Sequence, residues 1–217
     1  MKKIRFIFFL IISSNGLFAQ TKDFGVWTNL SLEKNLSTRL NFTLTESVRF
    51  DENASQLSQH LTSLSGSYKI TKKLSFSTTL RYAQKFKYDE SINLKSRFQI
   101  GFLYKIKIKN LGINLEERFQ SQLTNVKRAE NWEIPSNYFR SRITIKYDLK
   151  KKIEPFFSTE LFYNVGINFD NLRSRLGIEY EIDKFQSFKV FYMIDKEFNV
   201  KNPSTNYILG LGYKFSL

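Results

Sequence analysis

Apolar and polar residues alternate along most of this chain, in short stretches that are separated by polar turns. The clearest early stretch runs from Thr38 to Phe50, where alternate positions from Leu40 onward are apolar except at Glu46, and the positions between them are polar. Strand side chains point to opposite faces in turn, so such a stretch predicts a strand with one apolar and one polar face. Ten further stretches, some clear and some weak, show the same pattern: Phe24 to Glu33, Ser58 to Ile70, Leu74 to Phe86, Phe98 to Ile106, Leu111 to Gln122, Tyr138 to Leu149, Ile153 to Tyr163, Arg173 to Ile182, Phe188 to Asp195 and Tyr207 to Leu217.

The last stretch, Tyr207 to Leu217, has an aliphatic or aromatic residue at every second position. About ten tilted strand residues are enough to cross a bilayer, and amphipathic strands separated by turns are typical of outer-membrane barrels. The aromatic end is similar to the insertion signal of such barrels, so we expect Tyr213, Phe215 and Leu217 to engage the barrel-assembly machinery. After the first twenty residues, no run approaches the roughly 18 apolar residues of a membrane helix. The sequence therefore predicts an all-β, antiparallel, up-and-down transmembrane β-barrel of about 10 to 12 strands.

Eleven segments conflict with the even strand number of bacterial single-chain barrels. Either Phe24 to Glu33 is not a full member, or a further strand lies in the long polar loop Thr124 to Asn137. Short turns that carry lysine alternate with longer polar loops along the chain. We expect the short turns on the periplasmic side and the loops outside, with the C-terminal strand running into the periplasm.

The N-terminus has the pattern of a cleaved secretory signal. Basic residues precede an apolar run from Phe6 to Ile12, and the small residue Ala19 suits cleavage before Gln20. We predict a signal peptide over residues 1–19 and one barrel domain over residues 20–217, located in the bacterial outer membrane among its lipids. The chain has no cysteine, which excludes disulfides, thiolate metal sites and a lipid-modified cysteine anchor.

Removal of the signal lowers the formal charge from +14 to +11, because three basic residues leave with it. A basic chain often binds nucleic acid. An exported barrel does not routinely meet nucleic acid, and the lysines are spread over turns, so we expect no such partner. These lysines are either solvated turn residues or cations that attract anionic phospholipid headgroups.

The polar faces of the predicted strands are rich in arginine and carboxylates, which are costly against lipid and are expected to line the lumen. The candidate lumen residues are Arg39, Arg49, Arg81, Arg97, Arg118, Arg140, Arg142, Glu160, Arg173, Arg175 and Glu179. One hypothesis is a charge-paired network that fills the lumen and holds its shape. The other is a narrow, anion-leaning passage for small acidic solutes, because arginine outnumbers carboxylate.

Two other classes of function stay open. His60 is the only histidine, and with Ser58 or another serine it could serve a lipid-facing hydrolase. A soluble exported barrel that binds an apolar ligand would need apolar residues inside and polar residues outside. One histidine without cysteine gives no metal site with recognisable spacing, and no phosphate-binding glycine loop occurs, so we expect no cofactor, no metal and no enzyme activity.

Three stretches together resemble a known family. They are Phe24-Gly25-Val26-Trp27 near the predicted start of the mature chain, Leu44 to Arg49 before an acidic loop, and Leu80-Arg81-Tyr82 after a lysine turn. They resemble the outer-membrane barrels grouped as domain of unknown function 2490, from about Phe24 to Leu217. The resemblance implies a membrane-embedded barrel of unassigned role and transfers no catalytic residue.

Two carboxylates depart from the alternating pattern of these strands. Glu46 and Glu117 occupy positions on the otherwise apolar face of their predicted strands, and we expect β-bulges near the membrane surface to account for both.

Overall fold

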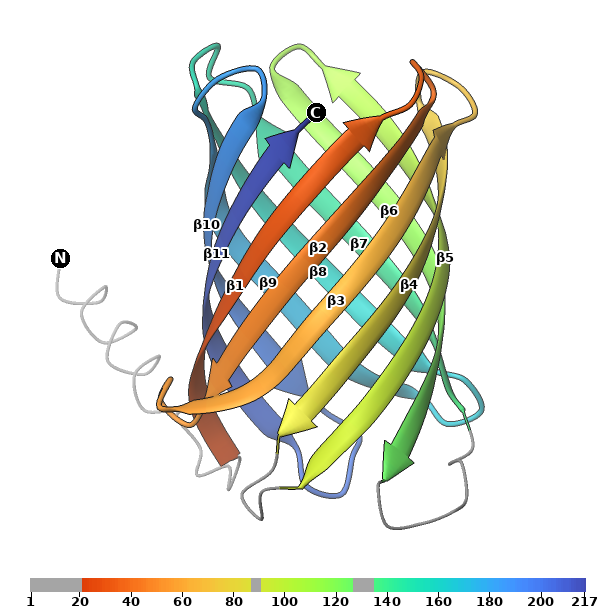
Figure 1. Cartoon of the computed structure of the whole chain (residues 1–217), viewed down its shortest axis with the longest axis vertical. Helices are drawn as coiled ribbons and strands as arrows, with labels where there is room; N and C mark the ends of the chain where they lie inside the picture. Colours follow the sequence, from red (N-terminus) through yellow and green to blue (C-terminus); the bar gives the residue numbers. More distant parts are fainter. Residues whose placement is uncertain (1–20, 87–90, 127–134) are drawn as a thin grey trace, which may run out of the picture.

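A computed structural model describes residues 21–86, 91–126 and 135–217, and these residues form a closed barrel of eleven strands (Figure 1). The strands are β1 (Thr21–Asn35), β2 (Leu40–Asp51), β3 (Gln56–Lys69), β4 (Leu74–Phe86), β5 (Ile92–Ile108), β6 (Leu111–Val126), β7 (Ser136–Tyr147), β8 (Ile153–Asn164), β9 (Phe169–Glu181), β10 (Gln186–Glu197) and β11 (Ser204–Ser216). The predicted signal peptide, residues 1–19, lies outside the described residues, as do residues 127–134 of the long loop.

Each strand pairs with the next one along the chain in antiparallel register, which confirms the up-and-down barrel. β1 closes the barrel against β11, and this pair is parallel, from Thr21 opposite Ser204 to Glu33 opposite Ser216. The expectation of an even strand number is therefore wrong, and the segment Phe24 to Glu33 is a full member. An odd number of up-and-down strands makes the first and last strands point the same way, and parallel pairing satisfies their backbone groups.

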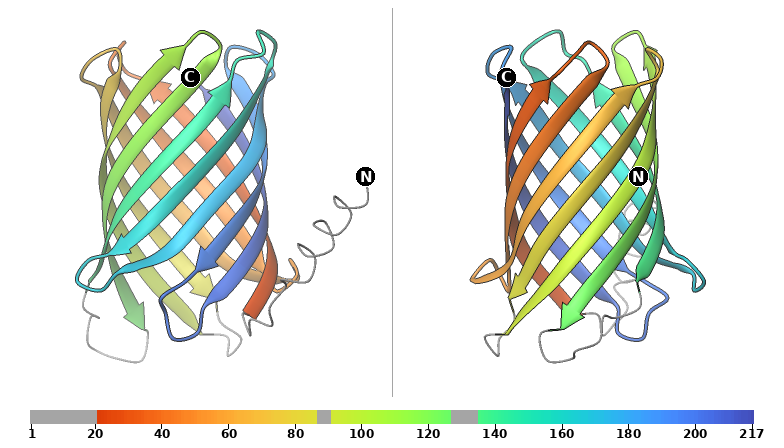
Figure 2. Two further views of the ribbon diagram at one scale, coloured as in Figure 1. Left: turned by 180° about the vertical axis from the view of Figure 1, so that it is seen from behind. Right: turned by 45° about the vertical axis from the view of Figure 1, so that its right-hand side comes forward.

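The connections define two ends of the barrel. Residues 36–39, 70–73, 109–110, 148–152 and 182–185 form the connections at the short-turn end, and residues 52–55, 165–168 and 198–203 form connections at the loop end. β4 and β6 also end, and β5 and β7 begin, at the loop end. The C-terminus lies at the short-turn end, whereas β1 begins at the loop end (Figures 1 and 2). The connection at 52–55 is as short as the turns opposite, because β2 and β3 both extend close to the rim.

The outer face of the wall is apolar and the lumen is charged. Leu80 and Leu176 on the outside are 58% and 65% exposed, whereas Glu160 and Arg140 inside are 1% and 5% exposed. This arrangement is the reverse of the one that a soluble barrel with an apolar ligand requires. No helix among the described residues is both long and apolar enough to cross a bilayer.

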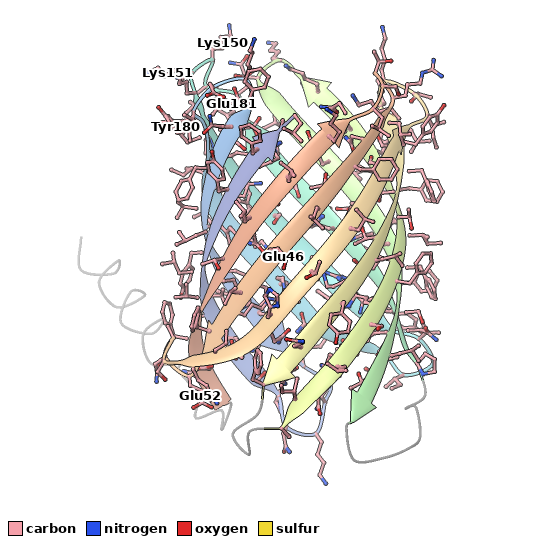
Figure 3. The ribbon with its side chains drawn as sticks, viewed as in Figure 1. Glu46, Glu52, Lys150, Lys151, Tyr180 and Glu181 are labelled. Atoms are coloured by element: carbon pink, nitrogen blue, oxygen red, sulfur yellow. The ribbon has the colours of Figure 1, made fainter. Side chains whose placement is uncertain are left out.

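Two carboxylates interrupt the apolar outer face. Glu46 pairs with Leu30 and Thr62 in continuous register, and Glu117 does so with Phe102 and Ser141. Figure 3 places Glu46 between Glu52 at the loop end and Lys150 at the short-turn end. The expected bulges at Glu46 and Glu117 are therefore wrong, since the register is regular there and both side chains project from the outer wall.

Apolar side chains share the lumen with the charges. Phe156, Phe191, Met193 and Ile208 are buried together on β8, β10 and β11. Gly210 makes this packing possible, because a Cβ at this position would lie 2.0 Å from the ring of Phe191. The lumen is thus partly filled by side chains rather than being a wide water-filled pore.

Candidate functional site: an arginine-lined vestibule in the lumen

All but one of the predicted lumen residues lie inside the barrel. Arg39 instead lies in the turn between β1 and β2 and is exposed, because β2 begins one residue later, at Leu40. Its backbone carbonyl accepts a hydrogen bond from the amide of Lys69. The residues that the structure brings into the lumen are Arg49, Arg81, Arg97, Arg118, Arg140, Arg142, Glu160, Arg173, Arg175 and Glu179.

Glu160 on β8 is the centre of a network at mid-lumen. Its Oε1 accepts hydrogen bonds from Arg140 Nε at 3.0 Å and from Arg118 Nη2, and Arg175 Nη2 lies 4.0 Å from Oε2. The neighbouring Glu116 contacts Arg142 and lies 3.4 Å from Arg118 Nε. A buried carboxylate is tolerated when several cations and hydrogen bonds compensate it. These groups come from adjacent strands β6 to β9, so the network ties that part of the wall together.

A second group of ion pairs lies toward the short-turn end. Glu179 Oε2 lies 2.9 Å from Lys189 Nζ and 3.6 Å from Lys146 Nζ, and Lys146 Nζ also lies 2.5 Å from Glu154 Oε1. The predicted residue Glu179 therefore has two lysine partners and serves as a bridge between β7 and β10.

The loop end holds a cavity of about 670 Å³, which we name the vestibule. Its wall over β2, β4 and β5 carries Arg49, Arg81 and Arg97. Each of these guanidiniums bonds a neutral side chain: Arg49 Nη1 donates to Gln59 Oε1 at 3.4 Å, Arg81 Nε to Ser63 Oγ at 2.8 Å, and Arg97 Nε to Gln122 Oε1 at 3.0 Å. Within the described part of the chain, none of the three forms an ion pair. The vestibule therefore has uncompensated positive charge.

Cations and aromatic rings alternate along the vestibule. The guanidinium of Arg49 lies 3.7 Å from the ring centroid of Trp27, and that of Arg173 lies 5.5 Å from Trp27 and 5.0 Å from Phe162. Arg140 completes the row at 4.3 Å from Phe162. Cations over aromatic faces are attracted by the ring quadrupole. The row fixes arginines whose charges would otherwise repel one another.

Both register irregularities of the barrel border this cavity. At the first, Arg49 pairs with Gln59 and Phe50 pairs with Leu57, which leaves Ser58 as the extra residue. At the second, Phe162 pairs with Asn171 and Tyr163 with Phe169, which leaves Asp170 as the extra residue. A bulge can redirect a side chain, and Asp170 lines the vestibule beside Asn171.

Sequence analysis did not single out Trp27, Gln122 or Phe162 as lumen residues. Trp27 lies two residues from Asn29, and Phe162 lies two residues from Glu160, so each aromatic residue shares the polar face of its strand. Strict alternation would therefore have placed both inside the barrel. They were missed because an aromatic residue on a polar face does not by itself predict a lumen position. Asp170 could not be found by parity, since it depends on the bulge.

The contacts of His60 do not assemble a hydrolase. Its Nε2 lies 3.0 Å from Glu46 Oε2, and the hydroxyl of Thr62 donates to that same carboxylate at 2.9 Å rather than to the imidazole. The candidate nucleophile Ser58 is buried, and its hydroxyl donates to the carbonyl of Arg49. A nucleophile must reach its base for this chemistry. Within the described ranges, no three histidine or acidic side chains gather closely enough to hold a metal ion.

The predicted insertion residues lie at the end of the barrel wall. Tyr213 and Phe215 belong to β11, and the Tyr213 hydroxyl donates to Gln186 Oε1. Leu217 follows the strand and is exposed, and its amide donates to the carbonyl of Glu33 on β1.

Comparison with known proteins gives a family and a fold. The beta domain of the Bordetella autotransporter Brka has a TM-score of 0.53 at 9% sequence identity, covering 83% of this chain and 85% of that chain. The translocator domain of the autotransporter NalP from Neisseria meningitidis has a TM-score of 0.47 at 11% identity, covering 80% of this chain and 73% of that chain. No curated protein matches in sequence. The family model "Protein of unknown function (DUF2490)" matches residues 24–206, so the resemblance seen in the sequence is confirmed and the chain belongs to this family.

Proposed function

We propose that this protein is a bacterial outer-membrane barrel whose vestibule binds small anions and admits them to a narrow passage. The observation that carries the proposal is the set of three arginines, Arg49, Arg81 and Arg97, which line one cavity and bond only neutral side chains. A guanidinium is always charged and recognises carboxylate and phosphate groups through paired N–H donors. An acidic solute would supply the negative charge that this wall lacks.

The outer surface supports a membrane location. Six of the described strands end at the short-turn end, and all of them except β1 carry an outward tyrosine within their last five residues: Tyr68, Tyr104, Tyr147, Tyr180 and Tyr213. Tyrosine belts occur at membrane–water interfaces, because the ring is apolar and the hydroxyl is wet. Beyond this belt the turns carry lysines, of which Figure 3 labels Lys150 and Lys151. Lipids are thus the proposed partner of the outer wall, and the short-turn end is the proposed periplasmic end.

The mid-lumen network limits what such a passage can carry. Arg118, Arg140 and Glu160 lie between the vestibule and the cavity of about 280 Å³ toward the short-turn end. Buried ion pairs with extra hydrogen bonds are rigid. We therefore expect a low conductance, with selectivity set by the vestibule.

Single-channel recording in planar bilayers tests the passage. The mature chain should give small, anion-selective currents, and the triple variant Arg49→Gln, Arg81→Gln, Arg97→Gln should lose that selectivity while remaining folded. A matched triple variant at the short-turn end, Lys150→Gln, Lys151→Gln, Lys152→Gln, removes the same charge from the opposite rim and should keep most of the anion selectivity. Cation selectivity in the native chain would contradict the proposal.

Binding can be measured even if the current is too small to record. Trp27 lies in the vestibule against Arg49, and the chain has one other tryptophan, Trp132. In a Trp132→Phe background, the fluorescence of Trp27 should change on titration with inorganic phosphate or acetate. The triple arginine variant should abolish this change, and its persistence would count against the vestibule.

Cysteine labelling tests the orientation, since the native chain has no cysteine. A membrane-impermeant maleimide should label Ser55→Cys at the loop end in intact cells. Lys151→Cys at the short-turn end should react only after the outer membrane is opened. The opposite pattern would invert the proposed orientation.

A variant that lacks Phe215 and Leu217 tests the proposed engagement of the barrel-assembly machinery, and it should insert more slowly in cells.

A further inference from the structure

The vestibule also carries carboxylates, and three of them, Asp51, Asp170 and Glu197, form no ion pair among the described residues. Asp51 lies two residues after Arg49 on β2, whereas the other two lie on β9 and β10. Asp170 accepts hydrogen bonds from the Tyr138 hydroxyl at 3.2 Å and from Asn164 Nδ2 at 3.3 Å. Glu197 accepts from the amide and the hydroxyl of Ser204, at 3.1 and 2.7 Å. These donors are all neutral, so Asp170 and Glu197 keep their negative charge uncompensated, as the three arginines keep their positive charge.

Most of the unpaired basic and acidic residues lie on opposite walls. Arg81 is on β4, with Arg49 and Arg97 on nearby strands β2 and β5, whereas Asp170 and Glu197 are on β9 and β10. Around the ring of eleven strands, β4 is five strands from both β9 and β10, and β5 is four and five strands from them, whereas β2 is four and three strands away. Arg81 and Arg97 therefore face the acidic wall of β9 and β10 across one cavity, and Arg49 lies to the side with Asp51.

A third carboxylate on the acidic wall, Asp195, differs from these two because it forms an ion pair. Asp195 Oδ2 lies 2.6 Å from Arg173 Nη2, so this carboxylate is neutralised within the wall. Asp170 has no such neighbour, because the bulge that adds it to β9 sets it apart from the regular row of inward residues. The acidic charge that faces the arginines thus comes from Asp170 and Glu197.

From this geometry we infer that the vestibule selects zwitterions, small molecules with a carboxylate at one end and an ammonium group at the other, such as amino acids or short peptides. This rests on the proposed anion-binding function and names its ligand class. The carboxylate binds the arginines of β2, β4 and β5, and the ammonium group binds Asp170 and Glu197. A simple anion meets only the first set and is repelled by the second, whereas a zwitterion satisfies both without adding net charge. A cavity of this size accommodates a solute of several non-hydrogen atoms.

Matched ligands test the inference through the fluorescence of Trp27 in the Trp132→Phe background. Hexanoate and 6-aminohexanoate have the same chain and the same carboxylate and differ only in the ammonium group. We expect 6-aminohexanoate to bind roughly fivefold to tenfold more tightly than hexanoate, the effect of one partly desolvated charge contact. A series from glycine through 4-aminobutyrate to 6-aminohexanoate should show affinity rising as the charge separation approaches the distance between the walls.

Matched variants identify the groups responsible. Asp170→Asn and Glu197→Gln should each reduce the preference for 6-aminohexanoate over hexanoate, and together they should abolish it, while hexanoate itself binds as well or better. Asp195→Asn is the control, because that carboxylate is already paired, and it should keep the preference. Arg97→Gln should weaken both ligands.

Each result is decisive for one of the two proposals. Equal binding of hexanoate and 6-aminohexanoate to the native protein would overturn the zwitterion inference and leave the anion vestibule in place. Binding of neither ligand would overturn both. If Asp170→Asn fails to fold, as shown by loss of the heat-dependent shift of folded barrels on gels, Glu197→Gln and the ligand pair still decide the question.

Discussion

The mid-lumen network and the vestibule use the same residue types in opposite ways. Around Glu160, arginines and carboxylates from neighbouring strands lie within contact of one another, and the charges cancel locally. In the vestibule, Arg173 and Asp195 still form an ion pair, but Arg97 bonds Gln122 and Asp170 bonds Tyr138. Each of these last two charges therefore meets a neutral partner, and its counter-charge lies across a cavity. Arrangement rather than composition therefore separates the part that holds the barrel together from the part that can bind a solute.

The comparison predicts opposite responses to the loss of a charge. In the network, one missing partner leaves the others buried and uncompensated, which is costly. In the vestibule, a missing arginine removes both a repulsion between cations and a partly desolvated charge without an ionic partner, so stability should change little and binding should change most.

The largest effect is expected from Glu160→Gln. This carboxylate is 1% exposed and compensates Arg118 and Arg140, so its neutralisation should lower the free energy of unfolding by about 3–5 kcal/mol. Urea titration in lipid vesicles, followed by tryptophan fluorescence, measures it. The control is Glu154→Gln, whose ion pair with Lys146 is partly exposed and should cost about 1 kcal/mol or less. Equal losses in the two variants would contradict a central role for Glu160.

A smaller loss is expected when the network is displaced rather than neutralised. A Cβ at Gly101 would lie 2.6 Å from Arg118 Cγ and 3.0 Å from the carbonyl of Glu117, so Gly101→Val must push Arg118 away from Glu160. Overpacking of this kind costs about 1–3 kcal/mol in the free energy of unfolding. Gly112→Val is the matched control, because its nearest neighbour is Lys146 Cβ at 3.8 Å, and it should be nearly neutral. The same urea titration compares the two.

The alternation of apolar and polar residues was enough to predict the barrel, its eleven segments and the lumen positions of most arginines. It failed at Arg39, where the strand begins one residue later than the pattern. The sequence could not predict the parallel closure, because the register between β1 and β11 joins residues 183 positions apart, as Thr21 and Ser204 are. Nor could the sequence say which arginines form ion pairs. Arg97 and Arg140 both point inward, but the neighbouring strands place Gln122 beside Arg97 and Glu160 beside Arg140.

The bulges mark a second limit. Alternation assumes one residue per step, and Asp170 enters the vestibule only because β9 carries one residue more than β8 at that point. The same assumption led us to expect bulges at Glu46 and Glu117, where the register is regular. Polar neighbours contact each carboxylate on the apolar face: His60 and Thr62 contact Glu46, and Ser141 contacts Glu117.

A modest stability effect with a large binding effect is expected from Arg97→Gln. The variant loses the hydrogen bonds to Gln122 but also removes a desolvated cation without an ionic partner, so the free energy of unfolding should stay within about 1 kcal/mol of the native value. Arg140→Gln, which leaves Glu160 short of a partner, should lose about 3 kcal/mol. Comparable losses would mean that Arg97 belongs to the structural network.

The smallest structural effect is expected from salt, which separates the two regions without a substitution. Raising the salt concentration from about 0.1 to 1 M shortens the Debye length from about 10 to 3 Å. Charges on opposite walls of an open cavity then act on a solute only at contact, so the affinity of the vestibule for hexanoate and the anion selectivity of the current should both fall. Glu160 and its arginines touch one another and exclude the added ions, so the unfolding midpoint in urea should scarcely move. A parallel loss of stability and selectivity would mean that salt reaches the mid-lumen network, and the vestibule would then not be a separate binding region.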